Sequence, residues 1–297
     1  MMELNKLLVL IDPEQDSQPA LSKALRLARI KNSALELLIC DHNSYLDDGR
    51  YFDPPQARKL RAEHLERNRE LLTEMAAPIK AQGFAVSTDV LWGNPPWEKV
   101  IARVIESRPD MLIHSVRRHN LLSRLLLSHR DWELIRRCPC PLLLAREKDW
   151  PSKPVFVAAI DPLHSNEKPA ELDGNLVAVG SDLAASSGGQ LYLFHCYYQP
   201  PVAGIYPIEM DEEYFRQKAL PLLQEFAIAE ERLLLSGKDI HQSLPACMEQ
   251  VSGDVVIMGV ISRSRLDRFF IGSTAEKLLD HIAEDILLLK PAHFQNW

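Results

Sequence analysis

The sequence predicts an α/β protein built from two similar halves. Short apolar segments alternate with segments that have helical spacing, and the apolar segments recur in the same order in the second half of the chain. Buried strands that alternate with helices form parallel sheets covered on both faces. The length of 297 residues is about twice that of an ordinary domain. We therefore expect two tandem domains, each a parallel sheet with helices on both faces.

Four apolar segments of the first half, each expected to form a strand, have counterparts in the second half. The matched segments are Leu7–Pro13 with Val155–Pro162, Leu35–Cys40 with Leu191–Cys196, Asp110–Ile113 with Asp254–Ile257, and Cys140–Leu144 with Glu284–Leu288. The first pair ends in the same Asp-Pro, at Asp12 and at Asp161. Four matches in the same order indicate an internal repeat.

Apolar residues at helical spacing lie between these strands. Helices are expected from Gln18 through Ala28, over Glu63–Ile79, over Glu98–Ile105 and over Tyr214–Leu235. Residues 146–154 are charged and contain two prolines, as is typical of a solvated connector. We expect one domain over residues 1–147 and the other over residues 154–292.

Composition and charge exclude several classes of protein. The 34 Lys and Arg residues against 41 Asp and Glu residues give a net charge of −7, which argues against a nucleic-acid or anionic-membrane binder. No apolar stretch approaches the ~18–20 residues that cross a bilayer, and the start lacks a signal-peptide pattern. We expect a cytoplasmic protein without membrane insertion, whose five cysteines are reduced thiols.

The segment after the fourth matched strand of the second half carries the strongest candidate site. Gly259 ends this strand, while Gly272 and Ser273 begin a predicted helix. Backbone N–H groups of a Gly-led turn at a helix N-terminus point outward and bind phosphate oxygens. Arg263 adds a cationic donor in the same loop. Gly259 and Gly272 have a second interpretation, in which they serve turn geometry and helix packing without a ligand.

This loop resembles the nucleotide loop of the universal stress protein family, which reads Gly, two residues, Gly, nine residues, Gly, then Ser or Thr. The corresponding positions are Gly259, Ser262, Gly272 and Ser273, with one Gly replaced by Ser. The resemblance covers both halves and is similar to the tandem, E-type members. It implies Rossmann-like, adenine nucleotide alpha hydrolase-like domains, each a doubly wound five-stranded parallel sheet of order 3-2-1-4-5.

The resemblance also implies a ligand, since members that bind ATP use this loop for the phosphates and the Asp after the first strand near the base and ribose. The implied cofactor is ATP with Mg²⁺ in the second half, although other members bind no nucleotide. The candidate binding residues are Asp161, Gly259, Ser262, Arg263, Gly272, Ser273 and Thr274. The first half has Ser115, Arg118, Ser128 and His129 in this frame and none of the three glycines, so no ATP site of this type is expected there.

The function implied is sensing or signalling in a stress response, in which a bound nucleotide orders residues 259–274 and changes a surface for a protein partner. Two alternatives stay open: an interaction or ligand-carrier module without nucleotide, and a slow ATP hydrolase for which no general base stands out. The two domains are expected to pair through their last strands, Leu142–Leu144 and Ile286–Leu289, and the chain to form a homodimer.

Two cysteine motifs have competing interpretations. Cys138-Pro139-Cys140 precedes the last strand of the first half, and His195-Cys196 ends a predicted buried strand. Both are more consistent with packing in the core than with metal binding or redox chemistry. No catalytic residue and no metal ligand is therefore assigned.

Overall fold

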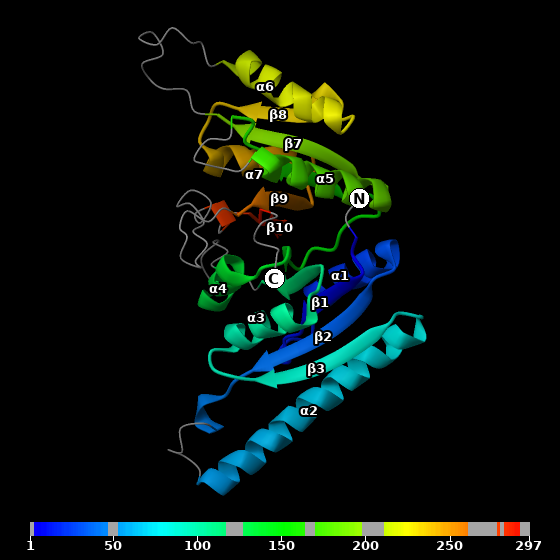
Figure 1. Ribbon diagram of the computed structural model, residues 1–297, viewed down its shortest axis with the longest axis vertical. Coiled ribbons are helices and arrows are strands. Elements are labelled where there is room, and N and C mark those ends of the chain that lie inside the picture. The colour runs from blue at the N-terminus through cyan, green and yellow to red at the C-terminus, as the bar shows by residue number, and fades with distance from the viewer. Residues whose placement is uncertain are drawn as a thin grey trace. The chain divides into compact units, whose positions relative to one another are not determined.

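The computed structural model describes residues 3–46, 53–116, 127–163, 170–197, 211–260, 278–279 and 282–291. Contacts between residues divide the chain into two compact units, coloured blue to green and green to red in Figure 1. The N-terminal unit takes in residues 3–116 and 128–149, and the C-terminal unit is built around residues 150–297.

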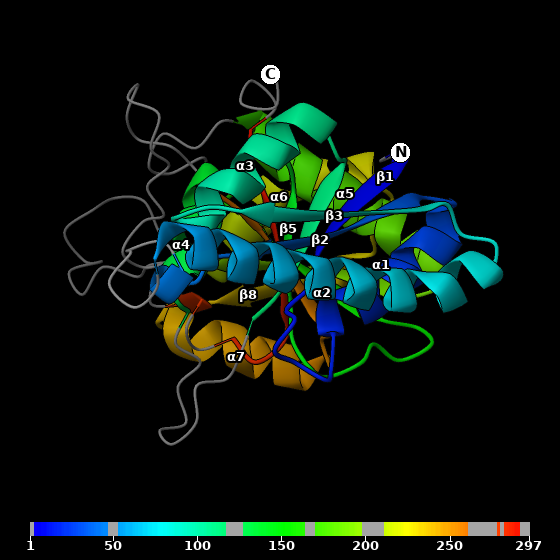
Figure 2. The ribbon, with the colours of Figure 1, turned by 90° about the horizontal axis from the view of Figure 1, so that it is seen from below.

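The N-terminal unit contains a parallel sheet with strand order β3-β2-β1-β4-β5. Its elements are β1 (Lys6–Leu10), α1 (Pro19–Lys31), β2 (Ala34–Asp41), the 3-10 helix η1 (Ser44–Leu46), α2 (Pro54–Ala81), β3 (Val86–Trp92), α3 (Pro96–Ser107), β4 (Met111–Ser115), α4 (His129–Arg137) and β5 (Leu142–Ala145). Helices α2 and α3 lie on opposite sides of the β2–β3 edge (Figure 2). The doubly wound order 3-2-1-4-5 is thus confirmed for this unit.

The C-terminal unit repeats this arrangement with strand order β8-β7-β6-β9-β10. Its elements are β6 (Val155–Ala159), α5 (Ala170–Ser187), β7 (Gln190–Cys196), α6 (Glu212–Glu225), the 3-10 helix η3 (Glu230–Arg232), β8 (Leu233–Ser236), α7 (Ile240–Gln250), β9 (Val255–Gly259) and β10 (Asp285–Leu289). Every pair of strands in this unit is parallel. The internal repeat inferred from the sequence is therefore a repeat of one topology.

The central strands of both units are buried, because helices cover both faces of a parallel sheet. In the N-terminal unit Leu7, Leu8 and Val9 have no exposed surface, and in the C-terminal unit the same holds for Val256 and Ile257. These are the apolar segments whose repetition indicated the fold. Their burial supplies the hydrophobic core of each unit.

The helices expected around Gln18–Ala28, Glu63–Ile79 and Glu98–Ile105 are confirmed as α1, α2 and α3. The helix expected over Tyr214–Leu235 is wrong in its second part. Helix α6 ends at Glu225, and the backbone turns at Ala227, which has a positive φ of 51°. The leucines that follow form strand β8. A short apolar run is compatible with both helical and strand periodicity, and here the pairing with β7 makes it a strand.

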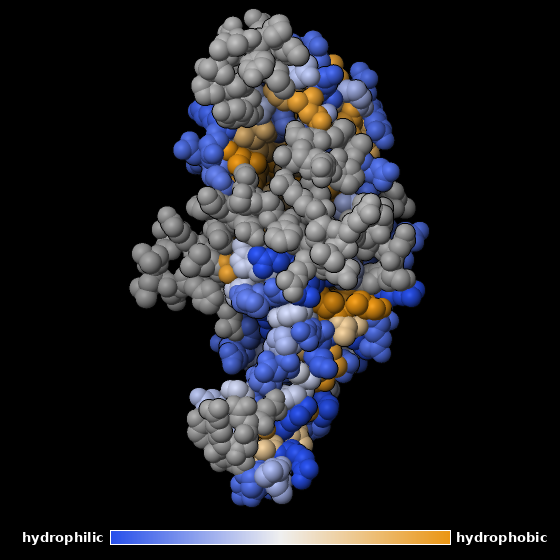
Figure 3. All heavy atoms as spheres, turned by 60° about the vertical axis from the view of Figure 1, so that its left-hand side comes forward, coloured by the Kyte–Doolittle hydropathy of each residue, from blue (hydrophilic) through white to orange (hydrophobic). Residues whose placement is uncertain are grey.

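One face of the molecule shows how polar and apolar side chains are distributed on the described residues (Figure 3). On the face shown in Figure 3, hydrophilic residues cover most of the coloured surface and hydrophobic residues form small separate patches. Within the part of the chain that the structure describes, no helix combines the length and the apolar character needed to span a bilayer.

Candidate functional site

Two of the predicted site residues lie at the ends of neighbouring strands. Strands β6 and β9 are paired, with Ala158 opposite Ile257. Continuing this register places Ile160 beside Gly259, so Asp161 follows at the same edge of the sheet. Ligands of open α/β sheets bind at this edge, outside the carboxyl ends of the strands. The structure therefore brings Asp161 and Gly259 together where a ligand of this fold would bind.

The backbone of Asp161 is held by an acidic side chain that sequence reasoning missed. The Asp161 N–H donates a hydrogen bond of 3.0 Å to Oδ2 of Asp173, in the first turn of α5. Asp173 is only 2% exposed. A carboxylate in the first turn of a helix is stabilised by the helix dipole, so its position in the sequence was the available signal. Asp173 fixes the start of the β6–α5 connection and with it the place of Asp161.

Gly259 is required by packing, whether or not a ligand binds. A Cβ at this position would lie 2.5 Å from Cδ2 of Leu172, a residue of α5 with no exposed surface. The equivalent strand end of the N-terminal unit has a different contact with its helix. Ser115 occupies the position of Gly259 there, and its Oγ accepts a hydrogen bond of 3.0 Å from the N–H of Ala20 in α1. Gly259 faces Leu172 of α5 in one unit, whereas in the other Ser115 bonds to the backbone of Ala20 in α1.

The losses from exchanging each member of this pair should therefore not add in the double variant. We expect Gly259→Ser to destabilise the C-terminal unit by about 2 kcal/mol through overlap with Leu172. Leu172→Ala alone should cost about 3 kcal/mol by leaving a cavity. Urea unfolding of the double variant should show a loss smaller than the sum by at least ~1 kcal/mol, since the serine fills part of the cavity. Strict additivity would show that the two side chains do not share this space.

The helix that follows the corresponding loop of the N-terminal unit is α4, and side chains of the protein itself already cap its N-terminus. The Ser128 side chain accepts from the N–H of Asp131, and the Asp131 carboxylate accepts from the N–H of Ser128, which forms a capping box at the start of α4. His114 Nε2 lies 2.7 Å from the same carboxylate. Burial raises the pKa of Asp131, but the bonds from His114 and Ser128 outweigh it and hold this pKa below its usual value.

A phosphate does not fit a helix N-terminus that already carries a buried carboxylate, because like charges repel and the N–H donors are taken. The equivalent of Asp131 in the second loop is Ala275 by the same spacing from the strand. The second loop has its acidic residue one position later, at Glu276, three residues after Ser273. The occupied N-terminus of α4 is a physical reason for expecting no ATP site of the family type in the first half.

The other predicted site residues, Ser262, Arg263, Gly272, Ser273 and Thr274, fall outside the residues that the structure describes. Arg118 of the first loop does so as well. The location of the candidate site therefore depends on Asp161 and Gly259, and the role of the loop stays a prediction.

The structure accounts for the His-Cys motif by packing. His195 is 6% exposed, its Nδ1 lies 3.0 Å from the carbonyl oxygen of Ile160, and its ring centroid is 5.1 Å from that of Phe215. Adjacent residues of a strand point to opposite faces, and the Cys196 thiol donates to the carbonyl oxygen of Lys238 at 2.9 Å. His195 and Cys196 thus face different helices instead of one metal ion. Over the described ranges, no cluster of three or more His, Cys, Asp or Glu side chains is placed to hold a metal.

The cysteines are all free thiols. Cys138 and Cys140 are buried, and their Sγ atoms lie 3.6 Å apart in a hydrogen-bond contact and not a disulfide. Burial raises the pKa of Cys40 to about 11. A thiol with so high a pKa is protonated at neutral pH and is a poor nucleophile. Cys40 is therefore a packing residue.

Comparisons with known proteins give a consistent result over nearly the whole chain. The sequence profile of the universal stress protein family matches residues 3–146 and 168–290. Universal stress protein E of Photorhabdus laumondii is 26% identical, with 99% of this chain and 98% of that protein covered. Universal stress protein E of Escherichia coli is 25% identical, with 98% and 95% covered.

Solved structures show the same architecture. A putative universal stress protein from Pseudomonas aeruginosa superimposes with a TM-score of 0.79 at 23% identity, covering 99% of this chain and 96% of that one. A universal stress protein from Archaeoglobus fulgidus gives a TM-score of 0.73 at 16% identity, covering 97% and 99%. Two matched segments, one in each unit, explain the repeat found in the sequence. The chain belongs to the universal stress protein family, as a tandem member with two copies of the domain.

Proposed function

We propose that the C-terminal unit binds an adenine nucleotide, ATP with Mg²⁺, and that the protein reports the bound state to a protein partner during stress. The observation that carries this proposal is the proximity of Asp161 to Gly259, the first residue of the loop that resembles the family's nucleotide loop. Backbone N–H groups after Gly272, together with Arg263, would hold the phosphates. Asp161 would lie near the base and ribose, as the resemblance implies, and Mg²⁺ would offset the phosphate charge.

The proposal assigns different roles to the two units. The second loop keeps two of the three glycines, at Gly259 and Gly272, and has Ala275 where the first loop has Asp131. The first loop holds Asp131 at its helix N-terminus. We therefore place a single nucleotide in the chain and assign the N-terminal unit a structural or partner-binding role.

The experiment is calorimetric titration of the full chain with Mg-ATP, supported by mass spectrometry of any ligand released from freshly purified protein. We expect one site per chain. Gly272→Val should weaken binding at least tenfold, because a branched side chain prevents the backbone from approaching the phosphates. Asp161→Asn should weaken it by a smaller factor through the loss of one charged acceptor.

A matched pair of variants distinguishes this site from adventitious binding. Asp12 occupies the position of Asp161 in the first half, where Asp12 Oδ1 accepts from the N–H of Glu14. Asp12→Asn should leave the affinity for Mg-ATP unchanged. Equal losses from Asp12→Asn and Asp161→Asn, or no heat at millimolar Mg-ATP, would reject the nucleotide proposal. Phosphate release that Gly272→Val removes would favour the alternative of a slow ATP hydrolase.

A further inference from the structure

Strand β8 is the last in the strand order of the C-terminal sheet and pairs on one side with β7. The N–H of Tyr197, just after β7, donates to the carbonyl oxygen of Ser236 at 2.9 Å. Backbone groups of alternate residues in a strand point in opposite directions, so those of Leu234 point with Ser236 towards β7. The backbone groups of Leu233 and Leu235 therefore face away from β7. The N–H of Leu233 donates to the carbonyl oxygen of Glu230, so the edge offers the C=O of Leu233 and both backbone groups of Leu235.

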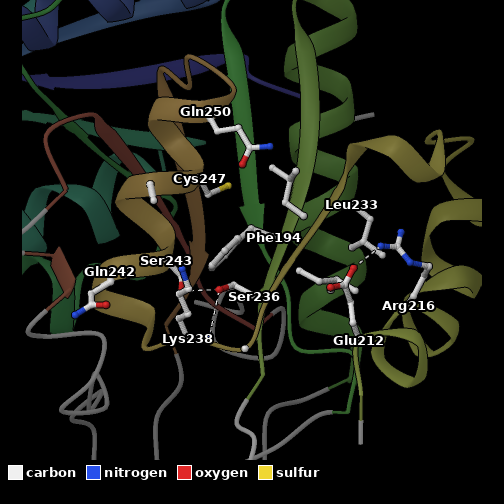
Figure 4. Close-up of a pocket in the computed structure, with 14 residues that line it drawn as sticks. Phe194, Glu212, Arg216, Leu233, Ser236, Lys238, Gln242, Ser243, Cys247 and Gln250 are labelled. Carbon is white, nitrogen blue, oxygen red and sulfur yellow. Dashed lines mark hydrogen bonds and ion pairs between the residues drawn. The ribbon is translucent and has the colours of Figure 1, made fainter.

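A groove of 760 Å³ follows this edge. Helix α7 covers one face of β8, where the hydroxyl groups of Ser236 and Ser243 lie 2.8 Å apart. Helix α6 covers the other face, where Phe215 packs on His195, the partner of Leu235 in β7. Both helices line the groove, and Figure 4 shows Ser243 on one side of it and residues of α6 on the other. The groove thus encloses the outer edge of β8 between two helical walls.

The β8 edge lacks the protection that edge strands usually carry. Natural edge strands are shielded by charged side chains, or by a covering helix, because free backbone groups pair with other chains. In the other unit, the edge strand β3 carries Asp89, which lies 3.8 Å from Arg103. Strand β8 reads Leu-Leu-Leu-Ser and has no charge, and Leu234 and Leu235 are partly exposed. An apolar edge inside a walled groove fits a site for another extended chain.

The charges of the groove indicate which end of such a chain lies where. Glu212 and Arg216 form an ion pair of 2.9 Å in α6 and offset each other. Among the lining residues, all of which are described, Lys238 is the cation without an acidic side chain within ion-pair distance. Lys238 follows the carboxyl end of β8. A chain that runs parallel to β8 would bring its own carboxyl end to this lysine.

We propose that the outer edge of β8 binds an extended apolar peptide segment of a partner protein as a sixth strand, parallel to β8, with a carboxylate at its carboxyl end beside Lys238. Main-chain hydrogen bonds to the C=O of Leu233 and to both backbone groups of Leu235 supply affinity, and the groove walls select side chains. Four or five residues match the length of β8 at ~3.3 Å per residue. The walls favour a single chain over a second copy of this protein, whose own α6 and α7 flank its β8 edge. The proposal does not depend on nucleotide binding.

The test uses the full chain and an array of fluorescein-labelled pentapeptides in which apolar residues alternate with threonine, each with a free carboxyl terminus. Fluorescence polarisation should show saturable binding for a subset. Amidation of the terminus should weaken binding about tenfold, as expected for loss of one charge-assisted contact. Lys238→Gln should weaken the free-acid peptide by a similar factor and leave the amidated peptide unaffected. Lys153→Gln, an exposed lysine outside the groove, is the matched control and should change nothing.

N-methylation of the peptide tests the strand geometry without altering the protein. Methylating the amides that would face β8 should abolish binding, whereas methylating the alternate amides should leave it within about twofold, since those N–H groups point to solvent. Leu235→Pro removes one outward N–H of β8 and should weaken binding at least tenfold. If this variant does not fold, the two sets of N-methylated peptides decide the question on the unaltered chain.

Three results would overturn the proposal. The first is that no pentapeptide of the array binds. The second is binding that is equally sensitive to both N-methylation patterns, which would make the groove a site for a small apolar ligand. The third is concentration-dependent dimerisation that Leu235→Pro abolishes and that peptides do not compete with, which would assign the edge to a second copy of the chain.

Discussion

Gly189→Ala is expected to destabilise the C-terminal unit by about 3 kcal/mol, a large loss for one added methyl group. Gly189 precedes β7, and a Cβ there would overlap the backbone carbonyl oxygen of Pro154. This oxygen cannot withdraw, because it accepts a hydrogen bond of 3.0 Å from the N–H of Gln190, where the pairing of β7 with β6 begins. Relieving the overlap would separate the two central strands at their first contact. Urea unfolding followed by circular dichroism measures the loss.

Two other glycines in the same unit serve as controls, because a Cβ at either position would contact no neighbouring atom. Gly188 has a φ of +66° and no neighbour that a Cβ would touch, so Gly188→Ala should cost only about 1 kcal/mol, the strain of a left-handed residue. Gly174 lies within α5 with open space around it, so Gly174→Ala should be neutral or stabilise the unit by up to about 1 kcal/mol. A loss for Gly189→Ala no larger than that for Gly188→Ala would contradict the proposed overlap.

Arg103→Met is expected to destabilise the N-terminal unit by about 3 kcal/mol, because it leaves a buried carboxylate without one of its two partners. Glu36 in β2 is 1% exposed, and its carboxylate lies 2.5 Å from Nε of Arg103 and 2.6 Å from Nζ of Lys6. Burial raises the pKa of Glu36, but the bonds from these two cations outweigh burial and hold the pKa below its ordinary value of 4.5. The charged form is thus maintained inside the sheet by its partners.

Glu36→Gln provides the control, because it removes the charge and leaves two cations that are 33% and 24% exposed and remain hydrated. We expect it to cost about half as much as Arg103→Met at neutral pH. Since the folded-state pKa of Glu36 is depressed, its contribution is present above the unfolded value of 4.5 and is lost as pH falls through the folded value. Thermal unfolding from pH 7 to pH 3 should therefore show that the unaltered protein is more stable than Glu36→Gln at neutral pH and that this difference in stability shrinks below about pH 4.5. A constant difference would mean that Glu36 is not ionised in the folded protein.

The fold could be predicted to the level of strand order, and the reason lies in the pattern of the central strands. Segments such as Leu7–Ile11 and Val155–Ile160 are continuous apolar runs, which is what a strand buried on both faces requires. Strand β8 was missed because Leu233–Leu235 is equally apolar at helical and strand spacing. The pairing with β7 that makes it a strand is a contact between segments, and no local pattern records it.

Loop spacing and the Asp that follows the first strand of each half predict the candidate site, and its role as a binding site stays a prediction. Asp161 and Gly259 are far apart in the sequence, and the pairing of β6 with β9 brings them to one edge of the sheet. The contacts of Asp173, Leu172 and Asp131 were not predictable. Each depends on how closely a helix approaches a strand end, which is set by the packing of the whole layer.

The order of residues alone shows that this protein is a tandem repeat of one α/β domain and that only the second copy keeps glycines in the loop of the family type. These features are local in the chain, so residue order expresses them directly. Packing between segments shows that Gly259 is needed against Leu172, that Asp131 caps α4, and that the leucines of β8 lie at an edge in a groove. Each of these depends on distances between segments remote in sequence, which only the packed structure defines.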